Sequence, residues 1–389
     1  MTQALAAGDP ALAATIAYRH AHAEMQAGSL GTIDRWRRGF SPDEARRDPL
    51  LLLLNGWADR GLGRVDDVRR WLALAAEAHV DGPLPDGTPS LAVARASLAM
   101  LFSGDGVKQT RRDARLVREA GPAASPWWST ACMFEAHAAA LSDRDADGVA
   151  LYEDAEFAAR GHAATHAVCR SHLAWHRFQA GDEAGGFEAA SAASAELRAH
   201  HLERYNLTVH VHAMAAYAAA RQGRRGDYDA AAERTLELAA SLAGAVPRSQ
   251  CQIRLVLAEG ALLLGAVGQA RELVGAAEPF LAAEPDAVVL WDWVDRLRER
   301  LAERRRREGA ASRYQLTEAE RRVLALLPTH HPLGEIGREL YISRNTVKTH
   351  AVSIYRKLGV SSRSAAVDRA RALGLLDDDD PGVTTTRSG

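Results

Sequence analysis

The stretch YISRNTVKTHAVSIYRKLGV, residues 341–360, has two different faces when it is drawn as a helix. An apolar stripe recurs at the i, i+4, i+7 and i+11 spacing of a single helical face, so it must be buried. It consists of Val347, Ala351, Ile354 and Leu358. The opposite stripe consists of Asn345, Lys348, Thr349, Val352 and Arg356. An ordinary exposed helix would more usually carry Glu/Lys pairs there, so this stripe indicates a surface with a special role.

The residues before this stretch predict two short helices. In LTEAERRVLALL, residues 316–327, Thr317 and Glu320 have the spacing of a capping box, so a helix is expected to begin there. In LGEIGREL, residues 333–340, Ile336 belongs to the apolar face and is expected to be buried.

A three-residue turn, YIS, leads into the next helix. Ser343 is placed to cap this third helix, which is expected over residues 344–358, and Gly359 is placed to end it in a left-handed conformation. A fourth helix is expected over residues 362–374. Two helices joined by so short a turn, the second with a polar outer stripe, predict a helix-turn-helix.

Basic charge is concentrated in this C-terminal part of the chain. The 389 residues together have a net charge of −2, whereas residues 313–376 hold 11 lysines and arginines against 5 aspartates and glutamates. A basic domain of this kind suits an anionic partner such as nucleic acid. Residues 377–389, DDDDPGVTTTRSG, are expected to be a disordered acidic tail.

Residues 1–308 lack sustained period-2 runs and show helical periodicity instead. Glycine turns such as RGLGRVDD at 60–67 and AGDEAGG at 180–186 recur about every 33 to 45 residues, which is the period of helix-hairpin repeats. An all-α, tetratricopeptide-like solenoid of stacked hairpins is therefore expected, with a compact helical bundle as the alternative. A linker at 309–313 is expected to separate this region from a second domain at 314–376.

The C-terminal residues resemble the LuxR/NarL-type DNA-binding domain. The resemblance is carried by LTEAERRVLALL and by EIGRELYISRNTVKTHAVSIYRKLGVSSRSAAV. Two positions depart from the family pattern, because Leu333 stands where a capping serine is frequent and Gly337 where alanine is usual. The region before it is similar in architecture to the MalT-like region of the large ATP-binding LuxR-type regulators. No G-x-x-x-x-G-K-[ST] loop is found, so their ATPase domain is not expected here.

The resemblance implies a transcription regulator that binds double-stranded DNA as a homodimer and contacts RNA polymerase. A small molecule or a protein bound to the helical repeats is the expected effector. The operator sequence, the identity of the effector and the sign of regulation do not follow from the sequence. The alternative function is a helical-repeat scaffold for protein interaction, in which DNA binding is secondary.

Groove chemistry divides the polar side chains of this domain into two sets. Base edges in the major groove present donors, acceptors and methyl groups, and the expected base contacts are Asn345, Lys348, Thr349 and Val352. Phosphate contacts set the register of a protein on DNA, and the expected ones are Arg344, Arg356, Lys357 and Arg363. The residues assigned structural roles are Thr317, Glu320, Ile336, Ser343, Val347, Ile354, Leu358 and Gly359.

The sequence shows no catalytic constellation. G-x-S-x-G, H-E-x-x-H and a glycine-rich dinucleotide turn are absent, so neither an enzyme nor a cofactor is expected. One histidine-rich stretch could lie on a single helical stripe, as a metal site, a ligand-lining surface or packing between repeats. It contains His162, His166, Cys169, His172 and His176. Packing is favoured, because the neighbouring residues supply no carboxylates, and no metal is expected.

The three cysteines, Cys132, Cys169 and Cys251, are odd in number and widely spaced, which argues against a disulfide framework. There is no signal-peptide pattern and no apolar stretch long enough to span a membrane. The sequence therefore predicts a cytoplasmic protein without a membrane partner.

Overall fold

The computed structural model describes residues 2–102, 106–121, 126–242, 246–329 and 331–376. These residues form helices, turns and loops, and none of them lies in a strand. The all-α fold expected from the helical periodicity is therefore confirmed. The chain divides into two units, Met1–Leu297 and Arg298–Gly389, a boundary earlier than the expected one at residue 308. The tail expected at residues 377–389 lies outside the described residues.

The first unit is a succession of helix hairpins. Its helices are α1 (Thr2–Ala6), α2 (Pro10–Gln26), α3 (Leu30–Arg37), α4 (Pro42–Arg47), α5 (Pro49–Gly61), α6 (Val65–Glu77), α7 (Leu91–Phe102), α8 (Val107–Glu119), α9 (Trp128–Ser142), α10 (Gly148–Ala158), α11 (Ala163–Gln179), α12 (Glu183–Ala199), the 3-10 turn η1 (Asn206–Thr208), α13 (Val209–Arg221), α14 (Arg225–Leu242), α15 (Pro247–Leu263) and α16 (Val267–Leu281). From α5 to α16, each odd-numbered helix contacts the even-numbered helix that follows it.

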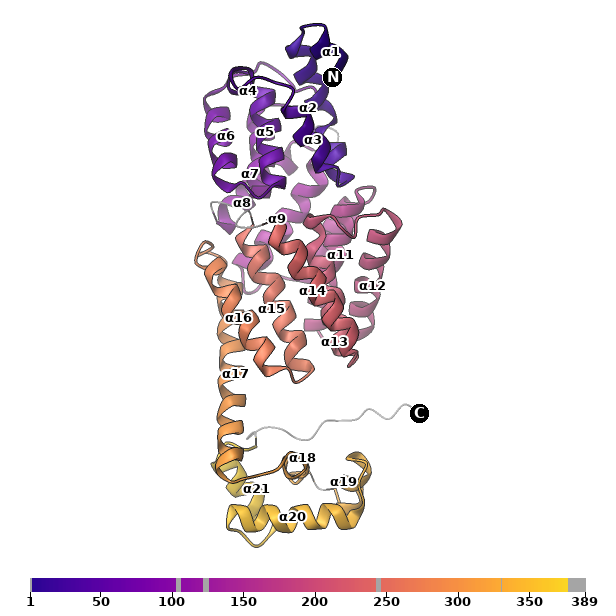
Figure 1. Ribbon diagram of the computed structural model, residues 1–389, viewed down its shortest axis with the longest axis vertical. Coiled ribbons are helices and arrows are strands. Elements are labelled where there is room, and N and C mark those ends of the chain that lie inside the picture. Colours follow the sequence, from indigo (N-terminus) through magenta and orange to yellow (C-terminus); the bar gives the residue numbers. More distant parts are fainter. Residues whose placement is uncertain (1, 103–105, 122–125, 243–245, 330, 377–389) are drawn as a thin grey trace. The chain divides into compact units, whose positions relative to one another are not determined.

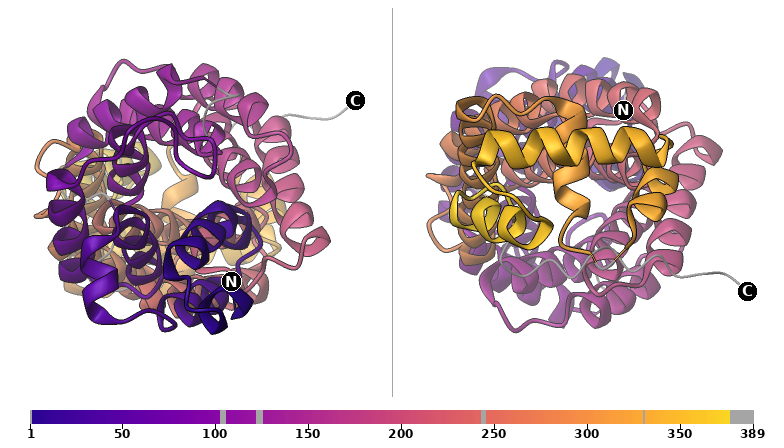
Figure 2. Two further views of the ribbon diagram at one scale, coloured as in Figure 1. Left: turned by 90° about the horizontal axis from the view of Figure 1, so that it is seen from above. Right: turned by 90° about the horizontal axis from the view of Figure 1, so that it is seen from below.

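The hairpins stack on one another. The first helix of each hairpin also contacts the first helix of the next, along the series α5, α7, α9, α11, α13 and α15. The hairpins of this unit wind round a common axis, with these helices on the inner side (Figure 2). A single hairpin could not bury its apolar face, whereas stacked hairpins bury it continuously. The tetratricopeptide-like solenoid predicted from the turn spacing is confirmed.

Helix α5 illustrates how deeply the inner helices are buried. Each leucine from Leu51 to Leu54 is at most 2% exposed, and Trp57 is 1% exposed. The Trp57 ring stacks on Trp127, with centroids 4.2 Å apart and planes at 11°. Burying one leucine contributes about 1.5–3 kcal/mol, so the leucine run is a main source of stability for this part of the unit.

Glycines end the first helix of several hairpins. Gly181 follows α11 with φ +82°, and the amide of Asp182 donates to the carbonyl of Arg177 at 2.9 Å. A side chain would be strained at positive φ, so glycine is favoured at this closing turn. The same place after α5, α13 and α15 is taken by Gly63, Gly223 and Gly265. The glycine spacing in the sequence is thus the spacing of helix ends.

Helix α17 (Val288–Arg313) is a single helix of 26 residues that continues through residues 309–313. The sequence predicted a linker at this place. Glu303 supports the helix by pairing with Arg306 at 2.5 Å and Arg307 at 3.1 Å. One glycine in a helix costs only about 1 kcal/mol relative to alanine, so Gly309 does not break it.

Four short helices follow in the second unit (Figure 1). They are α18 (Glu318–Leu326), α19 (Leu333–Glu339), α20 (Arg344–Leu358) and α21 (Arg363–Ala372). Helix α20 contacts α18, α19 and α21, so its inner face lies at the centre of the core. That core includes Val323, Leu324, Ile336, Val347, Ile354, Leu358 and Ala366. In the part of the chain that the structure describes, no helix is both long and apolar enough to cross a membrane.

Candidate nucleic-acid interface

The turn between α19 and α20 fixes where α20 begins. Tyr341 takes a left-handed conformation, with φ +56°, and the amide of Ile342 returns to the carbonyl of Gly337 at 2.8 Å. Ser343 then caps α20, because its hydroxyl accepts the amide of Thr346 at 3.1 Å. The cap satisfies one of the free amides at the helix start and holds α20 in place.

Helix α20 buries one stripe and exposes the other. The buried residues, at most 4% exposed, are Val347, Ala351, Ile354 and Leu358. The helix ends at Gly359, which is left-handed with φ +70°. The exposed residues of the opposite side are Arg344, Asn345, Lys348, Thr349, Val352 and Arg356. The packed stripe therefore presents the exposed one on a rigid element.

The middle of the exposed stripe combines polar and apolar groups. The Thr349 hydroxyl donates to the carbonyl of Asn345 at 3.0 Å. Its proton is thus used within the helix, and the side chain can offer a partner its methyl group and an acceptor oxygen. Val352, which is 58% exposed, extends this apolar surface.

Three cations of the exposed stripe are free to meet an external anion. Among the described residues, no carboxylate lies within ion-pair distance of Arg344, Lys348 or Arg356. On α18, by contrast, Arg321 is paired with Glu318. Unpaired cations gathered on one helix favour an anionic partner.

Lys357 lies at the end of α20 and is bound within the unit. Its Nζ is 2.5 Å from Glu320 Oε2 and 2.7 Å from the carbonyl oxygen of Gln315. Glu320 also completes a capping box with Thr317, whose amide donates to Oε2 at 2.7 Å and whose hydroxyl accepts the Glu320 amide at 3.3 Å. Burial raises the pKa of Glu320, but the hydrogen bonds from Lys357 and the neighbouring hydroxyls outweigh it and lower the pKa to about 2.

Arg363 begins α21 and is likewise bound within the unit. Its Nε donates to the carbonyl of Leu327 and its Nη1 to the carbonyl of His331, each at 2.8 Å. Its Nη2 donates to the carbonyl of Thr329. The guanidinium therefore closes the C-terminal end of α18, where free carbonyls need donors. Lys357 and Arg363 thus stabilise the unit through contacts that local sequence spacing does not reveal.

Helix α19 differs from the usual pattern at two places. Pro332 is its N-cap residue and offers no side-chain hydrogen bond. At Gly337, a Cβ would lie 2.7 Å from the carbonyl oxygen of Ile342, which is backbone and cannot easily move. Close approach of the turn therefore accounts for a glycine where the resemblance predicts alanine.

The histidine-rich stretch around α11 does not form one site. His166 lies between Glu156, at 3.3 Å, and Glu196, at 2.8 Å. His172 instead faces His210 of α13, with ring centroids 4.6 Å apart. Within the described ranges, no group of three or more histidines, cysteines or carboxylates has the arrangement of a metal site. His210 comes from a different hairpin, so local sequence spacing does not reveal that it lies beside His172.

The C-terminal unit has recognisable relatives. Residues 314–370 match the family described as "Bacterial regulatory proteins, luxR family". Two proteins of Mycobacterium tuberculosis, from strains CDC 1551 / Oshkosh and ATCC 25618 / H37Rv, are each named "Probable transcriptional regulatory protein NarL". Each is 45% identical to this chain over 62 residues, which are 16% of this chain and 29% of the relative's length.

One solved structure resembles a larger part of the chain. It is titled "Crystal Structure of Rap Protein Complexed with Competence and Sporulation Factor" and covers 71% of this chain and 80% of that one. The TM-score is 0.40 and the sequence identity 12%.

The family match and the geometry of α18 to α21 agree. A buried helix pair, a short capped turn and an outer stripe of unpaired cations occur within the matched residues. Residues 314–370 therefore form a helix-turn-helix domain of the LuxR family of bacterial regulatory proteins, the DNA-binding domain of a class of transcription regulators.

Proposed function

We propose that this protein is a sequence-specific transcription regulator that places α20, residues 344–358, in the major groove of double-stranded DNA. The observation that carries the proposal is the outer stripe of α20, which is exposed, carries cations without an ion-pair partner among the described residues, and is backed by a buried stripe. An α-helix fits the major groove, where each base pair presents a distinct pattern of donors, acceptors and methyl groups.

The base contacts are assigned by chemistry. Lys348 donates to O6 or N7 of a guanine, and Asn345 reaches an adenine or a neighbouring phosphate. Thr349 and Val352 meet a thymine methyl group with their apolar surfaces. The internal hydrogen bond of the Thr349 hydroxyl supports this assignment, because it leaves the methyl group as the main contact.

The phosphate contacts come from the two ends of the helix. Arg344 and Arg356 are exposed and unpaired among the described residues, which supports their assignment to the backbones on either side of the groove. Lys357 and Arg363, which the sequence also suggested for this role, mainly hold the domain together in this proposal. Tyr341, 95% exposed at the turn, is an additional donor to phosphate.

The whole protein acts as a homodimer on paired half-sites, because one helix-turn-helix makes few base contacts. Contact with RNA polymerase in the cytoplasm and control by an effector on the helical repeats complete the proposal. These parts rest on the resemblance of residues 314–370 to LuxR-type domains.

The test is enrichment of bound sequences from random duplex DNA by the full chain. We expect one recurring motif, and we expect the double variant Asn345→Ala, Lys348→Ala to lose it. Arg321→Ala, which removes a cation that is already paired on α18, is the matched control and should select the same motif. Failure to enrich any motif would favour the alternative of a protein-interaction scaffold.

A further inference from the structure

A guanidinium is buried inside the first unit without an acidic partner. Arg60, near the end of α5, is 3% exposed. Its Nε and Nη2 each reach only the carbonyl oxygen of Leu101, at 3.4 Å, and Nη1 has no hydrogen-bond partner among the described residues. Burial lowers the pKa of Arg60 to about 10, with Tyr205 acting in the opposite direction, so the group stays charged at neutral pH.

The adjacent carboxylate does not neutralise this charge. Asp59 is 1% exposed and is bound by Arg37 at 3.0 Å, by Arg64 at 3.3 Å and by the Trp71 indole N–H at 2.7 Å. In the described ranges, neither Asp59 nor any other carboxylate lies within ion-pair distance of Arg60. Burying an unpaired charge costs several kcal/mol, so the fold retains Arg60 at the expense of stability.

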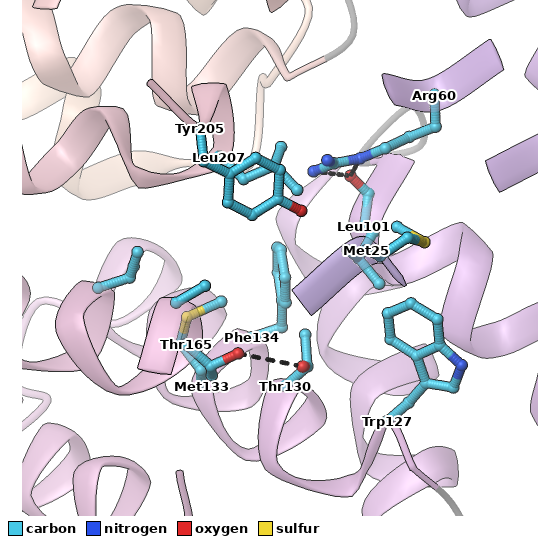
Figure 3. A pocket seen from close by; sticks show the side chains of 12 residues that line it. Met25, Arg60, Leu101, Trp127, Thr130, Met133, Phe134, Thr165, Tyr205 and Leu207 are labelled. Carbon is cyan, nitrogen blue, oxygen red and sulfur yellow. Dashed lines mark hydrogen bonds between the residues drawn. The ribbon is translucent and has the colours of Figure 1, made fainter. Parts of the chain in front are cut away.

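Arg60 borders a cavity of about 70 Å³ between the inner helices (Figure 3). The guanidinium extends towards the Tyr205 side of this cavity, and Trp127 and Phe134 lie on its other walls. The other polar side chains of the lining are uncharged. The hydroxyl groups of Thr130 and Thr165 face each other at 3.4 Å. The site is therefore a mostly apolar chamber with one fixed positive charge.

A second chamber, of about 50 Å³, shares Arg60 with the first. It is lined by His137, His172, His210 and Ser249, among others. Burial lowers the pKa of His210 to about 4 and holds the pKa values of His137 and His172 well below the ordinary value. Neighbouring imidazoles lower the pKa of His137 and His172 further, and Arg248 also lowers that of His137. These imidazoles are neutral at neutral pH, so the second chamber adds hydrogen-bonding groups but no charge.

We propose that this cavity binds a small amphipathic monocarboxylate, with its carboxylate on Arg60 and its apolar body against Trp127 and Phe134. A carboxylate would supply the hydrogen-bond acceptors that Arg60 lacks and could engage the guanidinium with two bonds. One charge is matched by one charge, whereas a doubly charged phosphate would leave a second charge buried and unpaired. The role of this cavity as the effector site of the regulator rests on the proposed function. Binding of the monocarboxylate itself does not depend on that function.

The walls of the cavity fit this class of ligand, and its small volume restricts the ligand to a short chain. Pockets for small organic ligands are mainly apolar with a few placed polar groups. Met25 and Met133 belong to the lining, and flexible thioethers adapt to ligands of different shape. The Tyr205 hydroxyl adds a donor beside the guanidinium.

The experiment titrates the full chain with butyrate and isobutyrate, and with butyramide and isobutyramide as uncharged matches. Ethyl phosphate serves as the doubly charged match. Calorimetry is the readout. We expect saturable binding of at least one monocarboxylate at or below about 1 mM, and affinity at least about 30-fold weaker for its amide and for ethyl phosphate. Equal binding of acid and amide, or no binding by either acid at that concentration, would overturn the proposal.

Two variants separate recognition from structure. Arg60→Met should abolish saturable binding and, without ligand, should be no less stable than the wild type, because an apolar side chain replaces a buried unpaired charge. Arg64→Met, which removes a cation that touches the adjacent Asp59, should keep the binding. Retained binding by Arg60→Met, or a marked loss of its stability without ligand, would show that Arg60 is structural.

DNA binding is measured on the same preparations, so that the two proposals can fail separately. Binding of a monocarboxylate with no enriched DNA motif would refute the regulator and leave the ligand site standing. An enriched motif with no binding of either acid would refute the ligand site and leave the regulator standing. If both hold, we expect the ligand to change the affinity for the motif in the wild type and not in Arg60→Met.

Discussion

The ammonium of Lys357, in the last turn of α20, lies 2.5 Å from a carboxylate oxygen of Glu320, in the first turn of α18. Both side chains are largely buried, with exposed fractions of 20% and 5%. The contact joins residues 37 positions apart and fastens the end of α20 to the helix that starts the domain. Two measurable properties of the C-terminal unit follow from it.

Removing the cation should destabilise the C-terminal unit. Lys357→Met leaves the Glu320 carboxylate buried without its partner, and we expect a loss of about 3 kcal/mol in the free energy of unfolding. All 8 tryptophans lie before residue 298, so tryptophan fluorescence reports the unfolding of the first unit alone. Far-UV circular dichroism reports both units, and the part of its transition that does not coincide with the fluorescence change measures the C-terminal unit. Adding Glu320→Gln should restore most of the stability. An unchanged midpoint in the single variant would contradict a stabilising pair.

The same pair predicts acid sensitivity. The folded pKa of Glu320 is about 2, below the ordinary value of 4.5. A carboxylate with a lowered pKa contributes stability above its unfolded pKa, and this contribution is lost as the pH falls from about 4.5 to about 2. The loss should amount to about 3 kcal/mol. It is measured by circular dichroism during acid titration, and Glu320→Gln should flatten the dependence. An equally steep acid transition in that variant would exclude Glu320 as its source.

The first unit should lose stability at a higher pH than the second. Burial lowers the pKa of His210 to about 4, and also that of His176, which Asp147 partly opposes. The unfolded chain binds these protons more readily, so stability present above pH 6.5 is lost as the pH falls towards about 4. Each histidine should contribute about 3 kcal/mol, measured by tryptophan fluorescence in urea.

Matched variants test this assignment. His210→Gln should make the urea midpoint of the first unit less dependent on pH. His79→Gln, at a side chain that is 85% exposed, should leave the dependence unchanged. Equal pH dependence in both variants would show that the buried histidines do not set it.

Local spacing in the sequence predicted a large part of the fold. Helical periodicity and regular glycine turns depend on neighbours a few residues apart, and they predicted the all-α class and the hairpin repeats. The two stripes of α20 could be identified from residues 341–360 for the same reason. The predicted linker at 309–313 shows the limit of this approach, because small residues are compatible both with a loop and with the helix that forms.

Contacts between distant residues could not be predicted in this way. Lys357 resembled a phosphate ligand because only the local motif was visible, and its bond to Glu320 needs the tertiary fold. The contact between His172 and His210, which belong to different hairpins, likewise depends on the tertiary fold. In the sequence, Arg60 is only the first residue of a glycine turn, whereas in the structure it borders the cavity.

Loss of a phosphate contact should weaken DNA binding without changing its specificity. Arg356→Ala should lower the affinity for all sequences alike, and the slope of log affinity against log salt should become shallower by about 0.9. The measurement is a titration of enriched and scrambled DNA at several salt concentrations, with Arg321→Ala as the control that changes neither value. A variant that altered base preference would move Arg356 into the set of base contacts.

The central claim is that the outer stripe of α20 contacts base edges in the major groove. Its most direct test combines Lys348→Ala with guanines replaced, one at a time in the enriched motif, by deazaguanine that lacks the N7 acceptor. For the wild type, we expect one replaced guanine to cost about 1–3 kcal/mol of binding free energy. For Lys348→Ala, the same replacement should cost almost nothing further, because the contact is already absent. Full sensitivity of Lys348→Ala at every guanine would contradict the claim.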